Sequence, residues 1–404
     1  MTAPAKAFLL RPDTLAMTAV LALLTSLGPL STDMYLPALP SIAAGLSATT
    51  AQTQLTLSAF LVGFACGQFV YGPVSDRFGR RPALLSGLVL FLLATIGCAL
   101  APSIEMLTLA RFAQALGASG PIVLARAIVR DLYEGPRAGR ELSRMGTIMG
   151  LVPAIAPVLG GVVYELFGWR AIFLAILLGG IAITAVVAPG LPETIRAKSP
   201  TPISFGSILR GFRSLLRHPG YRIYVALSTL TYSGLFAFIS GSSFVLQGTY
   251  GLPELAFAFS FAFMVVGFIS GTLLAQRLVG RRGLDGTIAL GVRAQAGGGL
   301  AMLILALAGT GSSLEITVPM ALYALGVGLT MPQALAAAMT PFPDRAGAAS
   351  SLLGICQMGT AALVGVGLGF AIGLTHLALP ATIAAMGLIA LALFWASAKA
   401  RAAV

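Results

Sequence analysis

The chain has 404 residues, of which 57% are hydrophobic and only 9% are charged. A soluble domain carries roughly 25% charged residues, so this composition excludes an ordinary soluble protein and indicates helices that face lipid or one another. The formal charge of +12 would suggest a nucleic-acid partner in a soluble protein. Here the basic residues lie in short turns between apolar runs, and we expect no nucleic acid to bind.

Apolar runs long enough to cross a bilayer recur along the whole chain. About 20 apolar residues span the hydrocarbon core as a helix, so a chain of this length has room for roughly twelve spans. The 48 glycines fit close packing between membrane helices. We predict an all-α integral membrane protein with spans at residues 14–37, 51–72, 83–101, 105–127, 141–163, 170–189, 221–243, 255–276, 285–308, 314–337, 347–372 and 377–397.

The basic residues divide sharply between the two ends of these spans. The turns between spans alternate between the two sides of the membrane. Of the 25 Lys and Arg residues, only Arg170 lies in the turns on one side, and only Arg111 and Arg293 fall inside spans. All the others lie in the alternate turns and the two termini. Because Lys and Arg beside a span resist translocation, we predict that both termini are cytoplasmic, in a multi-pass protein of the bacterial inner membrane.

The segment 190–220 is the longest polar stretch, and it is rich in proline and basic residues. It predicts a cytoplasmic linker between two six-span halves, residues 1–189 and 221–404. A repeat supports the division, since Gly79-Arg80-Arg81 recurs as Gly280-Arg281-Arg282, about half the chain away. Parallel repeats with a substrate site between them are typical of secondary transporters.

Asp33 is the one acidic residue that we place well inside a span. A charged Asp at the centre of a membrane helix is costly, about 2.5–3.5 kcal/mol, so such a residue normally faces a cavity and carries a function. We expect it to take up and release a proton. Arg111, at a similar depth in the fourth span, is its expected partner. The alternatives are a solvated Asp33 at the outer end of its span and an Arg111 that extends to the headgroups.

Neither a metal nor a cofactor is expected. Cys66, Cys98 and Cys356 lie within apolar runs without ligand spacing, and His218 and His376 are far apart in turns. A phosphate-binding G-x-x-x-x-G-K-[ST] loop is also missing from the sequence.

Five segments carry a resemblance to a known family: Thr32–Pro40 (TDMYLPALP), Gly72–Arg81 (GPVSDRFGRR), Arg111–Gly117 (RFAQALG), Pro153–Gly161 (PAIAPVLGG) and Phe342–Ser351 (FPDRAGAASS). The second, third and fourth resemble motifs A, B and C of the major facilitator superfamily. The first and fourth together resemble its Bcr/CflA-type branch of drug:proton antiporters. The resemblance implies twelve helices in two pseudo-symmetric six-helix halves.

The resemblance also implies roles for individual residues. The cytoplasmic gate of motif A would comprise Gly72, Asp76, Arg77, Gly79, Arg80 and Arg81, together with Asp131. Asp76, Arg80 and Asp131 would form a charge cluster that latches the halves in the outward-facing state. Residues i and i+4 can pair if the turn is helical, as Asp76 and Arg80 are spaced. The alternative is an ordinary solvated loop.

Motif C and the substrate cavity complete the set of candidate residues. Pro153, Pro157, Gly160 and Gly161 would bend and closely pack the fifth span, which in this family is thought to prevent uncoupled leak; simple helix packing is the alternative. Ala156 departs from the motif, which usually has Gly there. Candidates for the lining of an apolar cavity are Tyr35, Gln114, Tyr232, Phe236, Phe238 and Gln247, although core or lipid contact is an alternative for each.

We therefore predict a transporter and not an enzyme: a monomer that exports small, largely apolar compounds against proton entry by alternating access. Its partners are a small-molecule substrate, protons and the lipid bilayer. Export or import of a natural metabolite such as a sugar or amino acid is the first alternative. An integral-membrane enzyme is a second, but it would need clustered His, Asp, Glu or Cys side chains. A passive channel is a third, which motif C disfavours.

Overall fold

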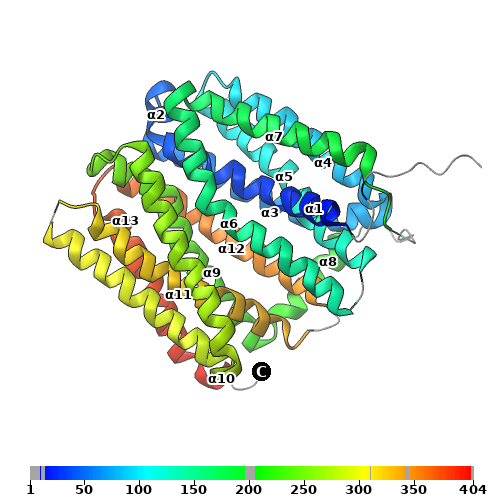
Figure 1. Ribbon diagram of the computed structural model, residues 1–404. Helices are drawn as coiled ribbons and strands as arrows, with labels where there is room; N and C mark the ends of the chain where they lie inside the picture. The colour runs from blue at the N-terminus through cyan, green and yellow to red at the C-terminus, as the bar shows by residue number, and fades with distance from the viewer. Residues whose placement is uncertain are drawn as a thin grey trace, which may run out of the picture.

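The computed structural model describes residues 10, 14–133, 135–195, 205–309, 311–342 and 345–401. These residues form helices and connecting turns, and no strand occurs among them. Figure 1 shows that the helices gather in two groups, one coloured blue to green and the other green to red. The residues 196–204 of the predicted linker lie outside the described ranges.

The first group is formed by the N-terminal helices. It comprises α1 (Leu15–Asp33), the short 3-10 helix η1 (Leu36–Ala38), α2 (Leu39–Gly45), α3 (Thr50–Phe78), α4 (Arg80–Ala99), α5 (Ile104–Leu132), α6 (Gly135–Phe167) and α7 (Trp169–Gly190). A separate helix, α8 (Phe205–Leu216), follows before the second group begins.

The second group is formed by the C-terminal helices. It comprises α9 (Pro219–Ser243), the π-helical segment η2 (Phe244–Thr249), α10 (Glu254–Ala308), α11 (Leu314–Met339), α12 (Ala346–Ile372), α13 (Ala378–Ala396) and α14 (Ala398–Arg401).

Eleven described helices are long and apolar enough to cross a membrane, and one of them, α10, has 55 residues. A helix that long spans more than 80 Å at about 1.5 Å per residue, so it holds two crossings. The break is Gly283, whose φ of 69° is not helical. All twelve predicted spans are therefore present, but the turn predicted between residues 276 and 285 is a single-residue reversal.

Several predicted boundaries are wrong, and two of them bear on the candidate residues. α1 ends at Asp33 and not near Pro37, because Pro37 and Pro40 lack the N–H group that continues a helix. α3 continues to Phe78, well beyond its predicted end. Most of the basic segment expected to be a loop is therefore helical, and the chain reverses at Gly79, whose φ of 113° favours glycine.

Both halves contain the same close approach between their third and fourth long helices. A Cβ atom on Gly117 of α5 would lie 2.8 Å from the carbonyl oxygen of Gly87 in α4. A Cβ atom on Gly326 of α11 would lie 2.5 Å from the carbonyl oxygen of Gly291 in α10. Only glycine permits these backbones to approach so closely. The two halves are thus built on one pattern, as the resemblance implied.

The halves meet mainly where α3 packs on α12 and α6 packs on α10. Ser58 in α3 donates a hydrogen bond to the carbonyl oxygen of Ala362 in α12, at 3.1 Å. At the end of the bundle that carries α2, Gln247 of η2 donates to the carbonyl oxygen of Pro37 in η1, at 3.0 Å. The two halves therefore touch at that end, which we call the opposite end.

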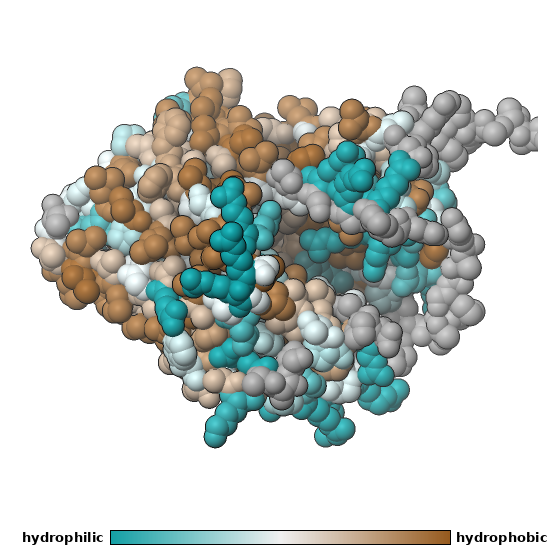
Figure 2. All heavy atoms as spheres, turned by 60° about the horizontal axis from the view of Figure 1, so that its bottom comes forward, coloured by the Kyte–Doolittle hydropathy of each residue, from teal (hydrophilic) through white to brown (hydrophobic). Residues whose placement is uncertain are grey.

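We call the other end of the bundle the basic end; it carries the Gly79 reversal, α8 and α14. Figure 2 turns the side with the C-terminus forward, where hydrophilic side chains gather around a hollow. Much of the remaining surface in Figure 2 is apolar. Large apolar side chains that are exposed include Leu178, Ile304 and Leu363. Apolar side chains that point outward around a bundle are typical of contact with lipid.

Candidate functional site

Arg111 of α5 lies in the interior of the N-terminal half and is fully buried. Its Nη1 donates to the carbonyl oxygen of Ser31 in α1, at 2.9 Å, and to Oε1 of Gln114, at 2.6 Å. Gln114 in turn donates from Nε2 to Oγ1 of Thr95 in α4, at 2.9 Å. This chain of contacts fixes the guanidinium between three helices, so Arg111 does not extend to the headgroups.

Aromatic rings enclose the Arg111 guanidinium. Its Cζ lies 4.3 Å from the ring centre of Phe60, 4.7 Å from that of Tyr35 and 6.0 Å from that of Phe173. Ring faces attract a cation, most strongly where water is excluded. The Nε and Nη2 groups of Arg111 have no hydrogen-bond partner. The site thus stabilises a buried cation while two of its donor groups stay available.

Asp33 is the last residue of α1 and is 6% exposed. Its carboxyl group makes no hydrogen bond or ion pair with any described residue, although Arg111 is within electrostatic reach. The structure brings the predicted partners into one region without a direct ion pair. A carboxyl group this buried and unpartnered gains little from being charged, because nothing replaces its lost hydration.

Of the predicted cavity-lining residues, Tyr35 and Gln114 contact Arg111 at this site, and the partly exposed side chain is that of Tyr232. It lies in α9 of the C-terminal half, within electrostatic reach of Asp33. Tyr35, Gln114 and Phe236 are instead buried in helix packing, with at most 1% of each side chain exposed. The Tyr35 hydroxyl group bonds to that of Thr56 at 2.9 Å. These three side chains have almost no exposed surface in this conformation, and their role in lining a cavity stays a prediction.

Phe238 and Gln247, the other lining candidates, also have structural partners. Phe238 is fully buried, and its ring packs on that of Phe261 with centroids 6.0 Å apart. Gln247 joins the two halves at the opposite end through its bond to Pro37.

The motif C glycines contact two different helices. A Cβ atom on Gly160 of α6 would lie 2.0 Å from the carbonyl oxygen of Met34, the residue that follows Asp33. A Cβ atom on Gly161 would lie 3.7 Å from the carbonyl oxygen of Glu254 in α10, an ordinary contact. Pro153 and Pro157 lie within the continuous helix α6. Motif C therefore sets how closely α6 approaches the Asp33 segment.

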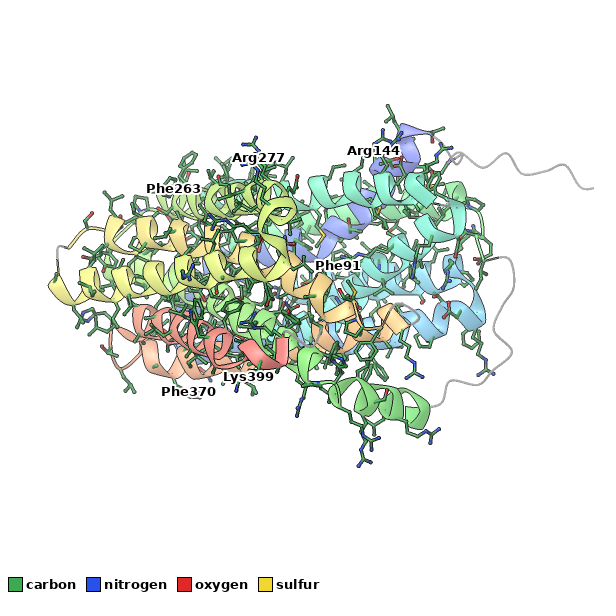
Figure 3. All side chains as sticks on the ribbon, turned by 90° about the horizontal axis from the view of Figure 1, so that it is seen from below. Phe91, Arg144, Phe263, Arg277, Phe370 and Lys399 are labelled. Atoms are coloured by element: carbon green, nitrogen blue, oxygen red, sulfur yellow. The ribbon has the colours of Figure 1, made fainter. Side chains whose placement is uncertain are left out.

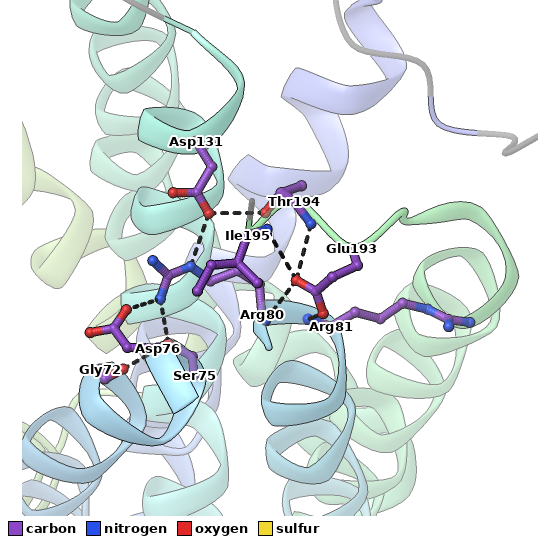
Figure 4. Close-up of polar contacts among 9 residues, drawn as sticks. All are labelled: Gly72, Ser75, Asp76, Arg80, Arg81, Asp131, Glu193, Thr194 and Ile195. Carbon is purple, nitrogen blue, oxygen red and sulfur yellow. Dashed lines mark hydrogen bonds and ion pairs between the residues drawn. The ribbon is translucent and has the colours of Figure 1, made fainter. Parts of the chain in front are cut away.

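Arg80 is the centre of a charge cluster at the basic end (Figure 4). Its Nε donates to Oδ2 of Asp131 at 2.9 Å, and its Nη1 donates to Oδ1 of Asp76 at 2.5 Å and to Oγ of Ser75 at 2.6 Å. Thr194 adds a hydrogen bond to Asp131 at 3.0 Å. The contacts of the Arg80 side chain all lie within the N-terminal half, and Thr194 belongs to the start of the linker.

Glu193 is a member of this cluster that the sequence did not reveal. Its carboxylate accepts from the backbone N–H of Arg80 at 2.8 Å and from that of Arg81 at 3.3 Å. A carboxylate at the start of a helix satisfies free N–H groups and complements the helix dipole. Arg81 donates to the carbonyl oxygen of Ala188 at 2.6 Å, while Arg77 lies over the Phe78 ring. Arg81 and Arg77 are therefore not part of the ion-pair cluster.

Gly72 is the remaining motif A residue. Its carbonyl oxygen accepts a hydrogen bond from Ser75 at 2.8 Å, and a Cβ atom added to Gly72 would meet nothing within 4 Å. Packing in this structure does not explain a need for glycine there.

A second charge cluster stands at the basic end of the C-terminal half. Arg401 of α14 forms an ion pair with Asp285, which also accepts from the Tyr224 hydroxyl group at 2.7 Å. The Arg401 guanidinium lies 3.6 Å from the ring centre of Phe394 and donates to its carbonyl oxygen. The motif A copy of this half has no aspartate at the matching place, so the acid and the base come from other positions.

Two further carboxylates are buried, contrary to the expectation that Asp33 stands alone. Glu141 of α6, 7% exposed, accepts from Thr18 at 2.6 Å and pairs with Arg144 at 2.7 Å. Glu315 of α11, 5% exposed, accepts from the Tyr250 hydroxyl group. Burial and the charge and hydrogen bond of Glu315 raise the pKa of the Tyr250 phenol. Both carboxylates have partners, which distinguishes them from Asp33.

The model of the "Major Facilitator Superfamily" matches residues 21–366. The chain belongs to this superfamily. Three curated relatives of this chain are named for resistance to drugs. A bicyclomycin resistance protein homolog of Haemophilus influenzae is 31% identical (87% of this chain, 88% of the relative). A chloramphenicol resistance protein of Pseudomonas aeruginosa is 32% identical (82% and 77%). Multidrug resistance protein D of Escherichia coli is 30% identical (84% and 84%). These relatives agree with the Bcr/CflA-type branch.

Solved structures confirm the fold of the superfamily transporter. A D-xylose-proton symporter matches with a TM-score of 0.75 over 94% of this chain and 97% of the other, at 17% identity. A bacterial homolog of the human lysosomal transporter Spinster, in an inward-facing and unoccupied conformation, matches with a TM-score of 0.73 over 96% and 97%, also at 17% identity. The protein is therefore a multi-pass membrane transporter of two six-helix halves.

Proposed function

We propose that this transporter exports small, largely apolar compounds from the bacterial cytoplasm in exchange for protons. The basic end would face the cytoplasm, together with both termini, because basic residues beside spans resist translocation. The observation that carries the proposal is the Asp33 carboxyl group, which is buried without a hydrogen bond or ion pair beside a buried Arg111. The names of the relatives support drug-like substrates.

Proton uptake by Asp33 would change the charge balance of the interior. Ionised Asp33 attracts the Arg111 guanidinium, whereas protonated Asp33 leaves that cation to its aromatic rings and to Ser31 and Gln114. A substrate with a hydroxyl or amino group could donate a hydrogen bond to ionised Asp33, and proton uptake by Asp33 would remove that charged acceptor. Substrate and proton would therefore compete for the Asp33 carboxylate, which is the requirement for exchange.

The same residues offer a route from charge to movement. Asp33 ends α1, and the next residue, Met34, packs against Gly160 of α6. Tyr232 brings the C-terminal half within electrostatic reach of the same carboxyl group. A change of charge at Asp33 would thus act on α6, which packs against α10, and on α9. Rocking of one half against the other would follow.

The Arg80 cluster would act as the cytoplasmic latch. In the present conformation its ion pairs stay inside the N-terminal half, and Asp76 is 53% exposed. Asp76 can therefore accept a further donor, from the C-terminal half, when the basic ends approach each other. We propose that this contact holds the outward-facing state.

Transport by purified protein in liposomes that hold a pH dye would test the exchange. A pH gradient is imposed, and a panel of antibiotics and metabolites is added. We expect a compound-dependent proton flux that Asp33→Asn abolishes. The matched control is Glu315→Gln, which neutralises a buried carboxylate outside the site and should leave the coupling intact.

Each outcome of this test has a definite meaning. Wild-type flux by folded Asp33→Asn would remove Asp33 from coupling. Flux of metabolites but not of antibiotics would overturn the drug assignment and favour the natural-metabolite alternative.

A further inference from the structure

Helix α8 lies outside the membrane bundle, beside its basic end, as the short green helix in the lower part of Figure 3. One side of α8 is packed on the protein. Leu215 is fully buried, and the Phe212 ring contacts that of Phe69 in α3, with centroids 6.1 Å apart. Two other leucines are not covered: Leu209 is 61% exposed and Leu216 is 42% exposed. Helix α8 therefore has an apolar strip beyond what the protein buries.

Arginines flank the uncovered leucines. At about 100° per residue, Leu209 and Leu216 point within roughly 20° of each other, and Arg213 points about 40° to one side of Leu209. Arg210 and Arg217 lie further round on that side, and all three arginines are exposed. Around the axis of α8, the buried side is therefore followed by an exposed apolar strip and then by a basic strip.

The charge carried by α8 and by the chain on either side of it has one sign only. The sequence has no acidic residue between Glu193 and Glu254. Arg345, at the start of α12, adds a further cation, because its Nη1 donates to Oγ of Ser214 in α8 at 3.2 Å. Helix α8 has no counter-charge of its own and therefore favours an anionic partner.

The position of α8 keeps this surface at the membrane boundary. Leu216 is three residues before Pro219, the first residue of the spanning helix α9. A chain segment that short cannot carry α8 far from the headgroups. Helices with exposed apolar residues beside a basic strip lie in the interface, with the apolar side in the acyl boundary and the cations among anionic headgroups.

We propose that Leu209, Leu216, Arg210, Arg213 and Arg217 form a binding surface for anionic phospholipids, which we call the α8 lipid face. The leucines enter the boundary of the acyl chains. The arginines contact phosphate groups, where each cation near an anionic surface adds to the binding. Bound lipid holds α8 against α3 of the N-terminal half and against α9 and α12 of the C-terminal half.

Hydrogen–deuterium exchange of the full-length transporter in nanodiscs tests this proposal. One set of nanodiscs contains phosphatidylcholine alone, and the other contains phosphatidylcholine and phosphatidylglycerol at three to one. We expect the backbone amides of α8 to exchange about tenfold more slowly in the anionic discs, because lipid bound to the folded helix opposes its opening. High salt should remove this slowing.

Matched variants identify the responsible residues. Arg210→Gln/Arg213→Gln/Arg217→Gln should lose the slowing, while Arg281→Gln/Arg282→Gln, which removes exposed arginines from the α10 reversal, should keep it. Exchange in α9 reports whether each variant is folded.

Three results would overturn the proposal. The first is equal exchange in both kinds of disc, and the second is slowing that survives in the triple variant. The third is equal slowing by soluble polyglutamate in phosphatidylcholine discs, which would indicate an acidic protein partner.

Discussion

Gly160→Ala is the sharpest perturbation that the structure offers. The added Cβ would stand 2.0 Å from the carbonyl oxygen of Met34, and also 2.7 Å and 2.8 Å from its C and Cα atoms. Cβ contacts below 3.0 Å are essentially never seen, so the oxygen must retreat by about 1 Å or more. Because all three atoms are backbone, no side-chain rotation relieves the clash. α1 or α6 must move.

The displacement falls on the residue beside Asp33. Overpacking of this kind costs about 1–3 kcal/mol of stability. Misplacement of a reacting group by 1 Å can reduce a rate by about 10². We therefore expect Gly160→Ala to lower proton-driven transport by roughly tenfold to a hundredfold. Its thermal unfolding temperature should fall as well, with the protein still monodisperse.

Gly161→Ala is the matched control for this prediction. Its Cβ would meet Glu254 and Ala258 at 3.7 Å and 3.9 Å, which are ordinary contacts. Both variants would be reconstituted at equal density, and pH-gradient-driven flux would be compared with the unfolding temperature. Wild-type flux in Gly160→Ala, or an equal loss in both variants, would refute the reasoning.

Three further predictions concern stability in detergent, read from thermal unfolding. Arg80→Gln should cost about 1–3 kcal/mol, because it leaves Asp131 without its ion pair; an unchanged midpoint would mean that the cluster is solvated and contributes little. Gln54→Leu should be neutral or stabilising by up to about 1 kcal/mol, since neither polar atom of the buried amide has a partner; a clear drop would reveal a hydrogen bond mediated by water. Arg401→Gln should lower stability by about 1–2 kcal/mol through loss of the Asp285 ion pair, and recovery in Arg401→Lys would show that the charge matters more than the fork-like guanidinium.

The helices and their number could be predicted from the sequence because the solvent is lipid. The backbone N–H and C=O groups of every span must form hydrogen bonds within the helix, and its side chains must be apolar. Each span can therefore be recognised as an apolar run of nearly fixed length. The ends of the helices were harder to predict from the sequence, as the extension of α3 to Phe78 shows. A helix can continue into water when its end is closed locally, and the N–H group of Gly79 does so by donating to the carbonyl oxygen of Ser75 at 3.0 Å. Glu193, from a distant part of the chain, caps the start of the next helix, α4.

The sequence predicted the charged residues of the candidate site but not the contacts that they make with other helices. Asp33 and Arg111 stood out because charged residues inside spans are few. Arg111 was expected to bond to the carboxylate, yet aromatic rings and a carbonyl oxygen hold it. No local sequence pattern predicts that Phe60 and Phe173, which lie on different helices, contact the same guanidinium. The Arg401 and Asp285 pair is likewise separated by more than a hundred residues.

The single-residue reversals at Gly79 and Gly283 bear on how such a protein can deform. Each reversal joins the ends of two long helices through one residue, so the two joined ends must move together. The end of α3 carries the start of α4 with it at Gly79, and the two parts of α10 are joined in the same way at Gly283. A reporter group at the start of α4 would therefore follow the motion of the adjoining end of α3.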